Sequence, residues 1–311
     1  MADGKWIPEL TADTPLSKAA RHALHVRLDV VQRHLPLAVE QADRDPEHVH
    51  QLRVATRRAA AALRIFASCL TSKAFNKTRK RLRRIRRAAG EARDWDVFRF
   101  DVLARQESAP AAQRPGLHYL LGHASGRRAA AQVGLVGTGT REGRRFDALM
   151  AETLDAIRPP DGNDETLGEL ARPLLAQLLD ELEEKAAGDL GDYAHLHQVR
   201  IAGKRLRYAM ELFAGCFDES FKEGLYPRVE AMQEILGRAN DSHVAARRLE
   251  EILAQGRAAL GAAWKPLRPG VAALVRFHRL RLPRERRAFL AWWEKWRKDG
   301  SPALRRLLAA A

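Results

Sequence analysis

Two segments of this chain carry histidines and closely spaced cationic residues in the same order. Residues 48–66 read HVHQLRVATRRAAAALRIF, and residues 195–213 read HLHQVRIAGKRLRYAMELF. The cationic and histidine positions that recur at a constant offset of 147 are His48/His195, His50/His197, Arg53/Arg200, Arg57/Lys204 and Arg58/Arg205. Arginine, lysine and protonated histidine donate charge-assisted hydrogen bonds to phosphate oxygens. Both segments are therefore candidates for binding a phosphate-rich anion.

The correspondence continues beyond these segments without a gap. Gly90 falls on Gly237, Asp94 on Asp241 and Val97 on Val244. A gapless match over about 70 residues is the pattern of an internal duplication. We interpret the chain as two halves of similar organisation.

Each repeated segment separates its apolar from its cationic residues when placed on an α-helix, at about 100° per residue. The apolar stripes are Leu52, Ala55, Ala59, Ala62, Leu63 and Phe66 in the first copy, and Val199, Ala202, Leu206, Ala209, Met210 and Phe213 in the second. The opposite faces carry His50, Arg53, Arg57 and Arg64, with Arg58 to one side, and His197, Arg200, Lys204 and Arg207. Such a pattern predicts a helix with one buried face and one anion-binding face.

A plain solvated basic face is the competing interpretation. This interpretation does not explain why both copies have the same spacing. A solvated basic face also usually includes acidic residues one turn away, which form salt bridges with the cations. Only Glu211 interrupts the cationic faces. We therefore favour a shared anion-binding role.

A second basic helix follows the first motif. Nine lysines and arginines lie between Lys77 and Arg93. On a helix, Lys77, Lys80, Arg84 and Arg87 share the face opposite the apolar stripe, and Arg79, Arg83 and Arg86 flank them. The corresponding helix of the second half is close to neutral. A third basic cluster is expected at a turn between the last two helices: Arg276, Arg279, Arg281, Arg284, Arg286 and Arg287.

Catalytic and metal-binding patterns are weak. Histidines two residues apart on a helix point about 200° apart and cannot share an ion, and the sequence has no HExxH, CxxC, P-loop or GxSxG motif. We predict no metal, no cofactor and no enzymatic activity. Asp94 and Asp241 could act as general bases, but a capping or salt-bridge role is favoured. Cys69 and Cys216 are expected to fill matching core positions.

The composition supports a polyanionic partner. The 311 residues include 54 Lys and Arg against 39 Asp and Glu, a net charge of +15. Residues 1–147 hold 28 of these cations and 15 of the acids, so most of the excess belongs to the first half. No apolar run is long enough to span a membrane. Two cysteines and the lack of a signal sequence favour a reducing, cytoplasmic location.

The elements that must position these residues are all helical. We predict helices at 15–42, 46–70, 74–106, 117–133 and 141–157, with a GTGT turn at 137–140, and a second set at 166–187, 193–215, 219–255, 262–281 and 284–298. The domain covers residues 12–300, with halves 12–157 and 164–300, a linker at 158–163 and a C-terminal tail at 301–311.

The repeated H-Q-[LV]-R-[VI]-A-x-[RK]-R segment, with the later glycine, aspartate and valine in each half, resembles the CHAD domain, the conserved histidine α-helical domain. The resemblance covers about residues 12–300. It implies two four-helix bundles related by a pseudo-two-fold axis, with a basic channel or cleft between the motif helices. It also implies binding of inorganic polyphosphate, association with polyphosphate granules, and no catalysis.

By position, the resemblance assigns polyphosphate binding to His50, Arg53, Arg57, Arg58, Lys80, Arg83, Arg84, Arg87, His197, Arg200, Lys204, Arg205 and Arg207. The first copy has Ala60 where the second has Arg207, and we include Arg64 as its replacement. Phosphate or sulfate could occupy the same positions. The alternatives are a nucleic-acid-binding helical protein, against which the lack of stacking aromatics and helix-turn-helix spacing argues, and a phosphohydrolase, which lacks metal-binding carboxylates. The sequence leaves the oligomeric state open.

Overall fold

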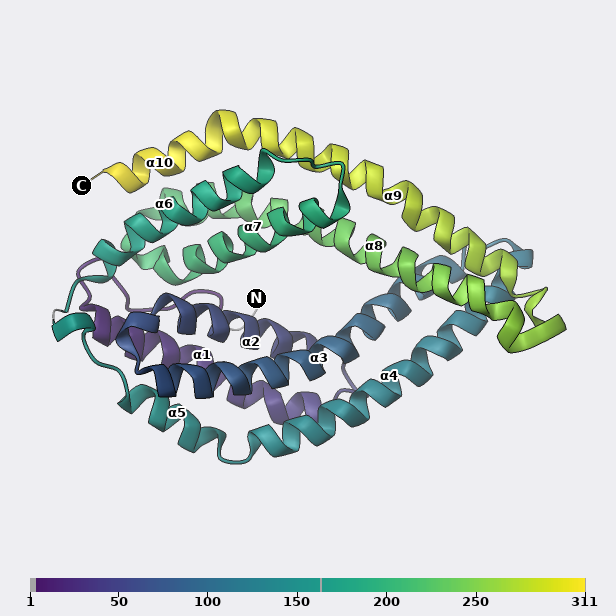
Figure 1. The fold of residues 1–311 in the computed structure, drawn as a ribbon, viewed down its shortest axis with the longest axis horizontal. Helices are drawn as coiled ribbons and strands as arrows, with labels where there is room; N and C mark the ends of the chain where they lie inside the picture. The colour runs from purple at the N-terminus through teal and green to yellow at the C-terminus, as the bar shows by residue number, and fades with distance from the viewer. Residues whose placement is uncertain (1–3, 163, 311) are drawn as a thin grey trace.

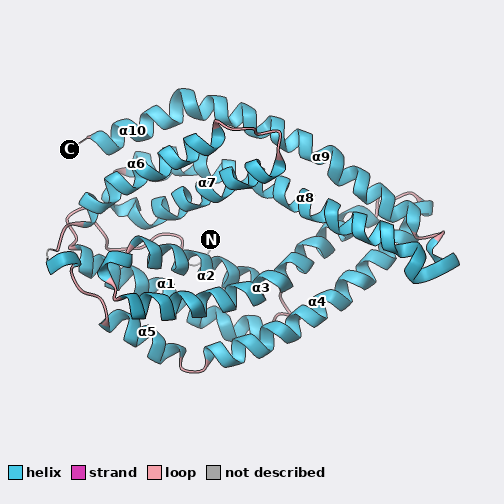
Figure 2. Cartoon of the chain, in the orientation of Figure 1, coloured by secondary structure: helices cyan, strands magenta, loops and turns pink. Residues whose placement is uncertain are grey.

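A computed structural model describes residues 4–162 and 164–310, and most of them are helical (Figure 2). These residues form ten α-helices, and their only β-type pairings are two isolated bridges. The all-α prediction is thus confirmed. Asn163, in the predicted linker 158–163, lies outside the described residues.

The helices fall into two groups (Figure 1). The first group is α1 (Leu16–Glu40), α2 (Glu47–Ile65), α3 (Ser72–Gln106), α4 (Arg114–Gly143) and α5 (Phe146–Asp155). The second group is α6 (Leu167–Ala186), α7 (Tyr193–Phe213), α8 (Tyr226–Leu260), α9 (Arg268–Lys295) and α10 (Ser301–Ala309). The two motif helices are α2 and α7, one in each group.

An aspartate side chain caps the start of each motif helix, just before its histidines. Asp45 Oδ1 accepts a hydrogen bond of 2.8 Å from the backbone N–H of Glu47, at the start of α2. Asp192 caps α7 by accepting bonds from the N–H groups of Ala194 and His195. These aspartates satisfy backbone donors that the first turn of a helix leaves unpaired. The first turns of α2 and α7 therefore place His50 and His197 on equivalent parts of their helices.

The predicted apolar stripes are buried. Every residue of the α2 stripe is at most 3% exposed, and every residue of the α7 stripe at most 6%. Each stripe packs into the core of its own group, since α2 contacts α1 and α3, and α7 contacts α6 and α8. The cationic faces are consequently turned away from the two cores.

The two groups contact each other in several places. Pro15, just before α1, and Thr166, just before α6, form an antiparallel bridge. Helix α2 contacts α7, α3 contacts α8 and α9, and the N-terminal segment contacts α8. At the far end of the molecule α4 contacts α9. There a Cβ on Gly116 would lie only 2.9 Å from the Cα of Gly270, so glycines permit this close helix crossing. The groups thus converge at both ends of the long axis (Figure 1).

Three predicted boundaries are wrong. The GTGT sequence is not a turn, because α4 continues through it to Gly143, and Gly139 lets α4 pack closely on Val39 of α1. The expected break near 281–284 is absent, since α9 runs unbroken through Pro283. The expected tail from 301 is a helix, α10, whose Leu304 and Leu308 are buried where it packs on α6. In all three, packing against a neighbouring helix outweighs local turn propensity.

Candidate anion-binding cleft

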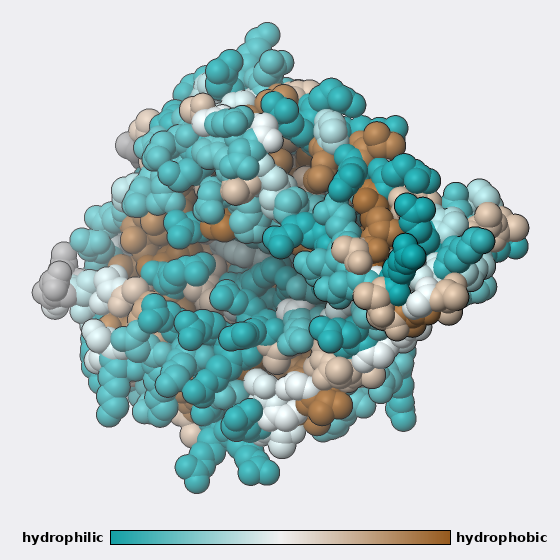
Figure 3. Space-filling model, turned by 45° about the vertical axis from the view of Figure 1, so that its right-hand side comes forward, coloured by the Kyte–Doolittle hydropathy of each residue, from teal (hydrophilic) through white to brown (hydrophobic). Residues whose placement is uncertain are grey.

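A cleft of about 1,200 Å³ opens between the two groups of helices. Its walls come from α2 and α3 on one side and α7 and α8 on the other, and α9 adds His278 and Arg281. Figure 3 shows the molecule hollowed at this place, with hydrophilic residues around the hollow. The cationic faces of both motif helices therefore share one space.

The inner part of the cleft brings together cations that form no ion pair among the described residues, although the charge of Asp241 offsets part of the cost of burying Arg200. Arg57 from α2 faces Arg200 and Lys204 from α7, and all three are half-buried. None of the three forms an ion pair in the described part of the chain, and Arg200 Nε is buried without a hydrogen-bond partner. Close cations with no counterion destabilise one another and favour a bound anion.

This crowding lowers the pKa values of the cations. Burial, followed by repulsion from Arg57 and Arg200, lowers the pKa of Lys204 to about 6. Burial and the neighbouring Arg53 lower the pKa of Arg57 to about 10. At neutral pH the lysine is therefore mostly neutral, whereas both arginines keep their charge.

Arg53 is partly neutralised. Its Nη1 atom donates a 2.5 Å hydrogen bond to Asp94 Oδ1 on α3 and a 3.4 Å bond to the carbonyl oxygen of Gly90. This contact supports the salt-bridge role favoured for Asp94. Next to it, burial and the charge of Arg93 lower the pKa of His50, which therefore lines the cleft as a neutral ring at pH 7.

The second motif histidine sits in a polar and aromatic setting. The ring centroid of His197 lies 6.2 Å from that of Tyr193, whose hydroxyl donates a 3.0 Å hydrogen bond to Asn240 Oδ1 of α8. The ring of Tyr193 stacks on His243 at a centroid distance of 3.4 Å. Burial and the nearby Arg200 lower the pKa of His197. These contacts hold the His197 ring at the cleft wall.

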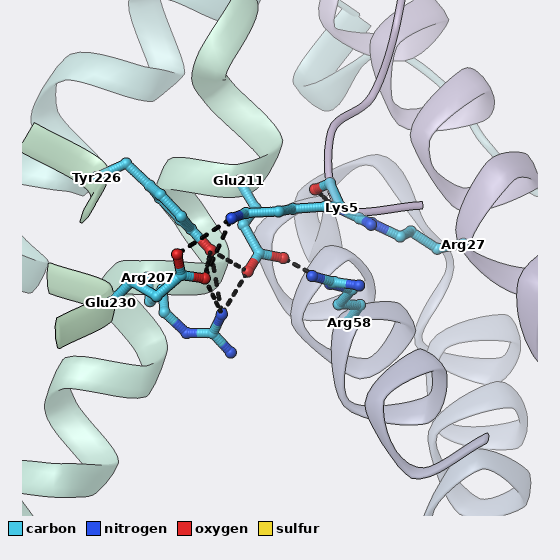
Figure 4. A network of polar contacts seen from close by, with 7 residues as sticks. All are labelled: Lys5, Arg27, Arg58, Arg207, Glu211, Tyr226 and Glu230. Carbon is cyan, nitrogen blue, oxygen red and sulfur yellow. Dashed lines mark hydrogen bonds and ion pairs between the residues drawn. The ribbon is translucent and has the colours of Figure 1, made fainter. Parts of the chain in front are cut away.

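The structure removes Arg58 from the predicted binding set. Arg58 is only 4% exposed, and its Nε atom donates a 2.6 Å bond to Glu211 Oε2 of α7, which is fully buried (Figure 4). Arg207 bonds Glu211 Oε1 at 2.8 Å, and Tyr226 donates to the same oxygen. We correct both arginines to structural partners of Glu211, because a buried carboxylate requires this compensation.

The α3 residues separate into two sets. Arg87 lines the cleft. Lys80 and Arg83 are exposed outside it, and Arg84 bonds Glu142 of α4 at 3.0 Å. We therefore withdraw Lys80, Arg83 and Arg84 from the proposed set, since α3 turns that face outward.

The remaining predicted residues lie at the cleft. Arg64 is exposed at the edge of the cleft. Arg205 also lines the cleft, and its Nη1 atom lies 3.1 Å from Glu181 Oε2 in an ion pair. The structure adds cleft-lining residues that the sequence interpretation missed: Arg86, Arg93, Tyr208, Arg238, Arg248 and Arg281. Arg86 and Arg93 occur one helical turn on either side of Gly90, a spacing that could have identified them.

The described residues form neither a metal-ion cluster nor a membrane-spanning helix. No three His, Cys, Asp or Glu side chains gather where they could hold a metal ion. Within the same residues, none of the helices combines the length and the hydropathy of a bilayer-spanning segment. Cys69 is buried and Cys216 is half-buried, each as a free thiol.

Comparisons with known proteins agree with this architecture. The family model of the CHAD domain matches residues 22–250. The crystal structure of the CHAD domain from the plant Ricinus communis is similar over 99% of this chain and 96% of its own, with 29% identity and a TM-score of 0.66. PptA from Streptomyces chartreusis is similar over 90% of this chain and 100% of its own, with 18% identity and a TM-score of 0.71. No curated protein matches the chain.

Proposed function

This chain belongs to the CHAD domain family, and on that basis we propose that it binds inorganic polyphosphate in the cleft between α2 and α7. The proposal is one of binding without catalysis. Polyphosphate is a linear polymer with a negative charge on every unit, so a row of cations matches it along its length. Phosphate or sulfate ions would occupy single positions of the same row.

The observation that carries the proposal is the unpaired cation cluster. Arg57, Arg200 and Lys204 come from both halves, are half-buried, and form no ion pair among the described residues. Two of the three buried arginines among the described residues are paired with a carboxylate, Arg58 with Glu211 and Arg128 with Asp96, whereas Arg27 donates a hydrogen bond to the carbonyl oxygen of Lys5. A cluster left unpaired at a cleft supports an external anion as the missing counterion.

We extend the proposal to the internal duplication and its symmetry. Each motif helix supplies one histidine and a pair of cations to the same cleft, namely His50, Arg53 and Arg57 from α2, and His197, Arg200 and Lys204 from α7. A pseudo-two-fold axis between α2 and α7 accounts for this arrangement. The α3 wall adds more arginines than the α8 wall, so we expect the polymer to contact the first half more closely.

A competition experiment tests the choice of ligand. Affinity for long-chain polyphosphate is measured with excess duplex DNA or RNA, across a series of salt concentrations. We expect polyphosphate to remain bound when the nucleic acid and the polyphosphate carry the same total negative charge. Displacement by nucleic acid would contradict the proposal, and release of orthophosphate would contradict the absence of catalysis. Colocalisation with polyphosphate granules in cells tests the further expectation of granule association.

A matched set of variants tests the site itself. Arg57→Ala combined with Arg200→Ala should weaken polyphosphate binding at least tenfold, because hydrogen bonds to charged groups contribute about 1.5–3 kcal/mol each. The melting temperature of the ligand-free protein should not fall, because the two guanidinium groups repel each other. Arg287→Ala, which removes an exposed cation outside the cleft, should leave affinity within about twofold. Equal losses in both proteins would mean that the net charge, rather than the cleft, binds the polymer.

A further inference from the structure

The end of the cleft nearest the α4–α9 crossing is chemically different from the cationic inner part. Along α3 it is lined by Val97, Phe98 and Phe100, and along α8 by Val244 and Ala245. The polar residues beside them are Arg248 and the Asp101–His278 pair, whose atoms lie 2.9 Å apart. Phe100 is 46% exposed and Val244 is 39% exposed, although both side chains are apolar. The cleft therefore offers an apolar surface that is continuous with the cation cluster.

An inorganic phosphate chain has no group that would contact this apolar surface. We propose that the cleft also accepts nucleoside polyphosphates such as ATP, with the phosphates on the cation cluster and the base against Phe100. This inference rests on the proposed function for the phosphate part of the ligand. It assigns the apolar end a separate role, which is recognition of an aromatic base.

The order of side chains along α3 fits such a ligand. Arg93, Val97 and Phe100 follow one another at intervals of three and four residues, so they form one stripe along the cleft. Asp94, which holds Arg53, precedes Phe100 by six residues, or roughly 9 Å along the helix axis. This spacing corresponds to a ribose with one or two phosphates.

The surroundings of Phe100 are also suited to stacking of a nucleobase. Its ring is half exposed, and the guanidinium carbon of Arg93 lies 6.0 Å from the ring centroid. An aromatic ring beside an arginine gives a stacking surface together with a cation for the phosphate next to the ribose. Val97 and Val244 are placed to contact the other parts of the nucleoside. Most small-molecule sites combine an apolar wall with a few polar groups in this way.

The test compares ATP with methyl triphosphate by calorimetry at one pH and salt concentration. Both are triphosphate monoesters of equal charge, so they differ only in the nucleoside. Stacking of a base on an aromatic side chain is worth about 1–3 kcal/mol, and we therefore expect ATP to bind at least about fivefold more tightly. Phe100→Ala should remove this difference and leave the affinity for methyl triphosphate unchanged.

Phe277→Ala is the matched control, because Phe277 is 37% exposed on α9 but does not line the cleft. It should preserve the preference for ATP. Equal affinities of ATP and methyl triphosphate, or no binding of either, would overturn the inference even if long-chain polyphosphate binds. A parallel loss of both ligands in Phe100→Ala would overturn it as well. Failure of polyphosphate itself to bind would instead refute the proposed function.

Discussion

Lys204 should make both the stability of this protein and its ligand binding depend on pH. Its pKa is lowered from 10.5 to about 6 in the folded chain, through burial and the charges of Arg57 and Arg200. In the unfolded chain the lysine regains its ordinary pKa. Between about pH 6 and pH 10.5 the unfolded state therefore binds one more proton than the folded state, so stability rises with pH in this window. Below pH 6 Lys204 is charged in both the folded and the unfolded chain, so the folded protein bears the full free-energy cost of burying that charge.

The perturbation that isolates this effect is Lys204→Met, which keeps the length of the side chain and removes its charge. Each pH unit within the window is worth up to about 1.4 kcal/mol. Between pH 6.5 and 8.5 the wild-type protein should therefore gain roughly 1–2.5 kcal/mol more stability than the variant. Arg57 and Arg200 remain charged over this range, and His50 and His197 are present in both proteins. Urea unfolding of both proteins without ligand, at several pH values, measures the difference.

Ligand binding should reverse the shift, because a bound phosphate chain stabilises the protonated lysine. At pH 7 about nine-tenths of the folded molecules carry a neutral Lys204 if its pKa is about 6. Binding of polyphosphate should then take up roughly 0.5–0.9 proton more in the wild type than in Lys204→Met. Calorimetry in buffers of different ionisation enthalpy counts these protons. The same stability profile in both proteins, together with the same proton uptake, would refute the reasoning.

Three further predictions concern the contacts around the cleft. Glu211→Gln should destabilise the protein by about 3–5 kcal/mol in urea unfolding, because it leaves the buried Arg58 and the partly buried Arg207 without their shared carboxylate. A loss below about 1 kcal/mol would contradict this account. Gly270→Ala should lower the melting temperature, because the added Cβ would overlap backbone atoms of α4. Gly134→Ala is the matched control: its Cβ would enter open space, and the variant should raise the melting temperature slightly. Asp94→Asn should strengthen polyphosphate binding several-fold in a titration, because it frees Arg53, and unchanged or weaker binding would argue against this account.

The internal contacts of each half could largely be predicted from the sequence. A helix with a period of 3.6 residues has one buried face, so the apolar stripes of α2 and α7 followed from their residue types alone. The cationic rows followed in the same way, because residues three or four apart share a face. The resemblance of the repeated motif to the CHAD domain agrees with the family match.

Helix ends and the outer face of α3 could not be predicted in this way. Local turn residues suggested breaks at 137–140 and near Pro283, but long-range packing keeps α4 and α9 continuous. On α3, cations occur on nearly every face, so the sequence did not show which of them meets the cleft. Only contact with α4 shows that Arg84 belongs to Glu142.

What the sequence by itself determined is therefore the all-helical class and the buried face of each motif helix, since both depend on neighbours along the chain. The tertiary structure decided which cations find a partner. Arg58 and Arg57 are adjacent in sequence, yet the crossing of α2 and α7 places Arg58 on Glu211 and leaves Arg57 facing Arg200 and Lys204. The physical reason is that the free energy of a buried charge depends on the charges of the opposing helix, which lies far away in the sequence.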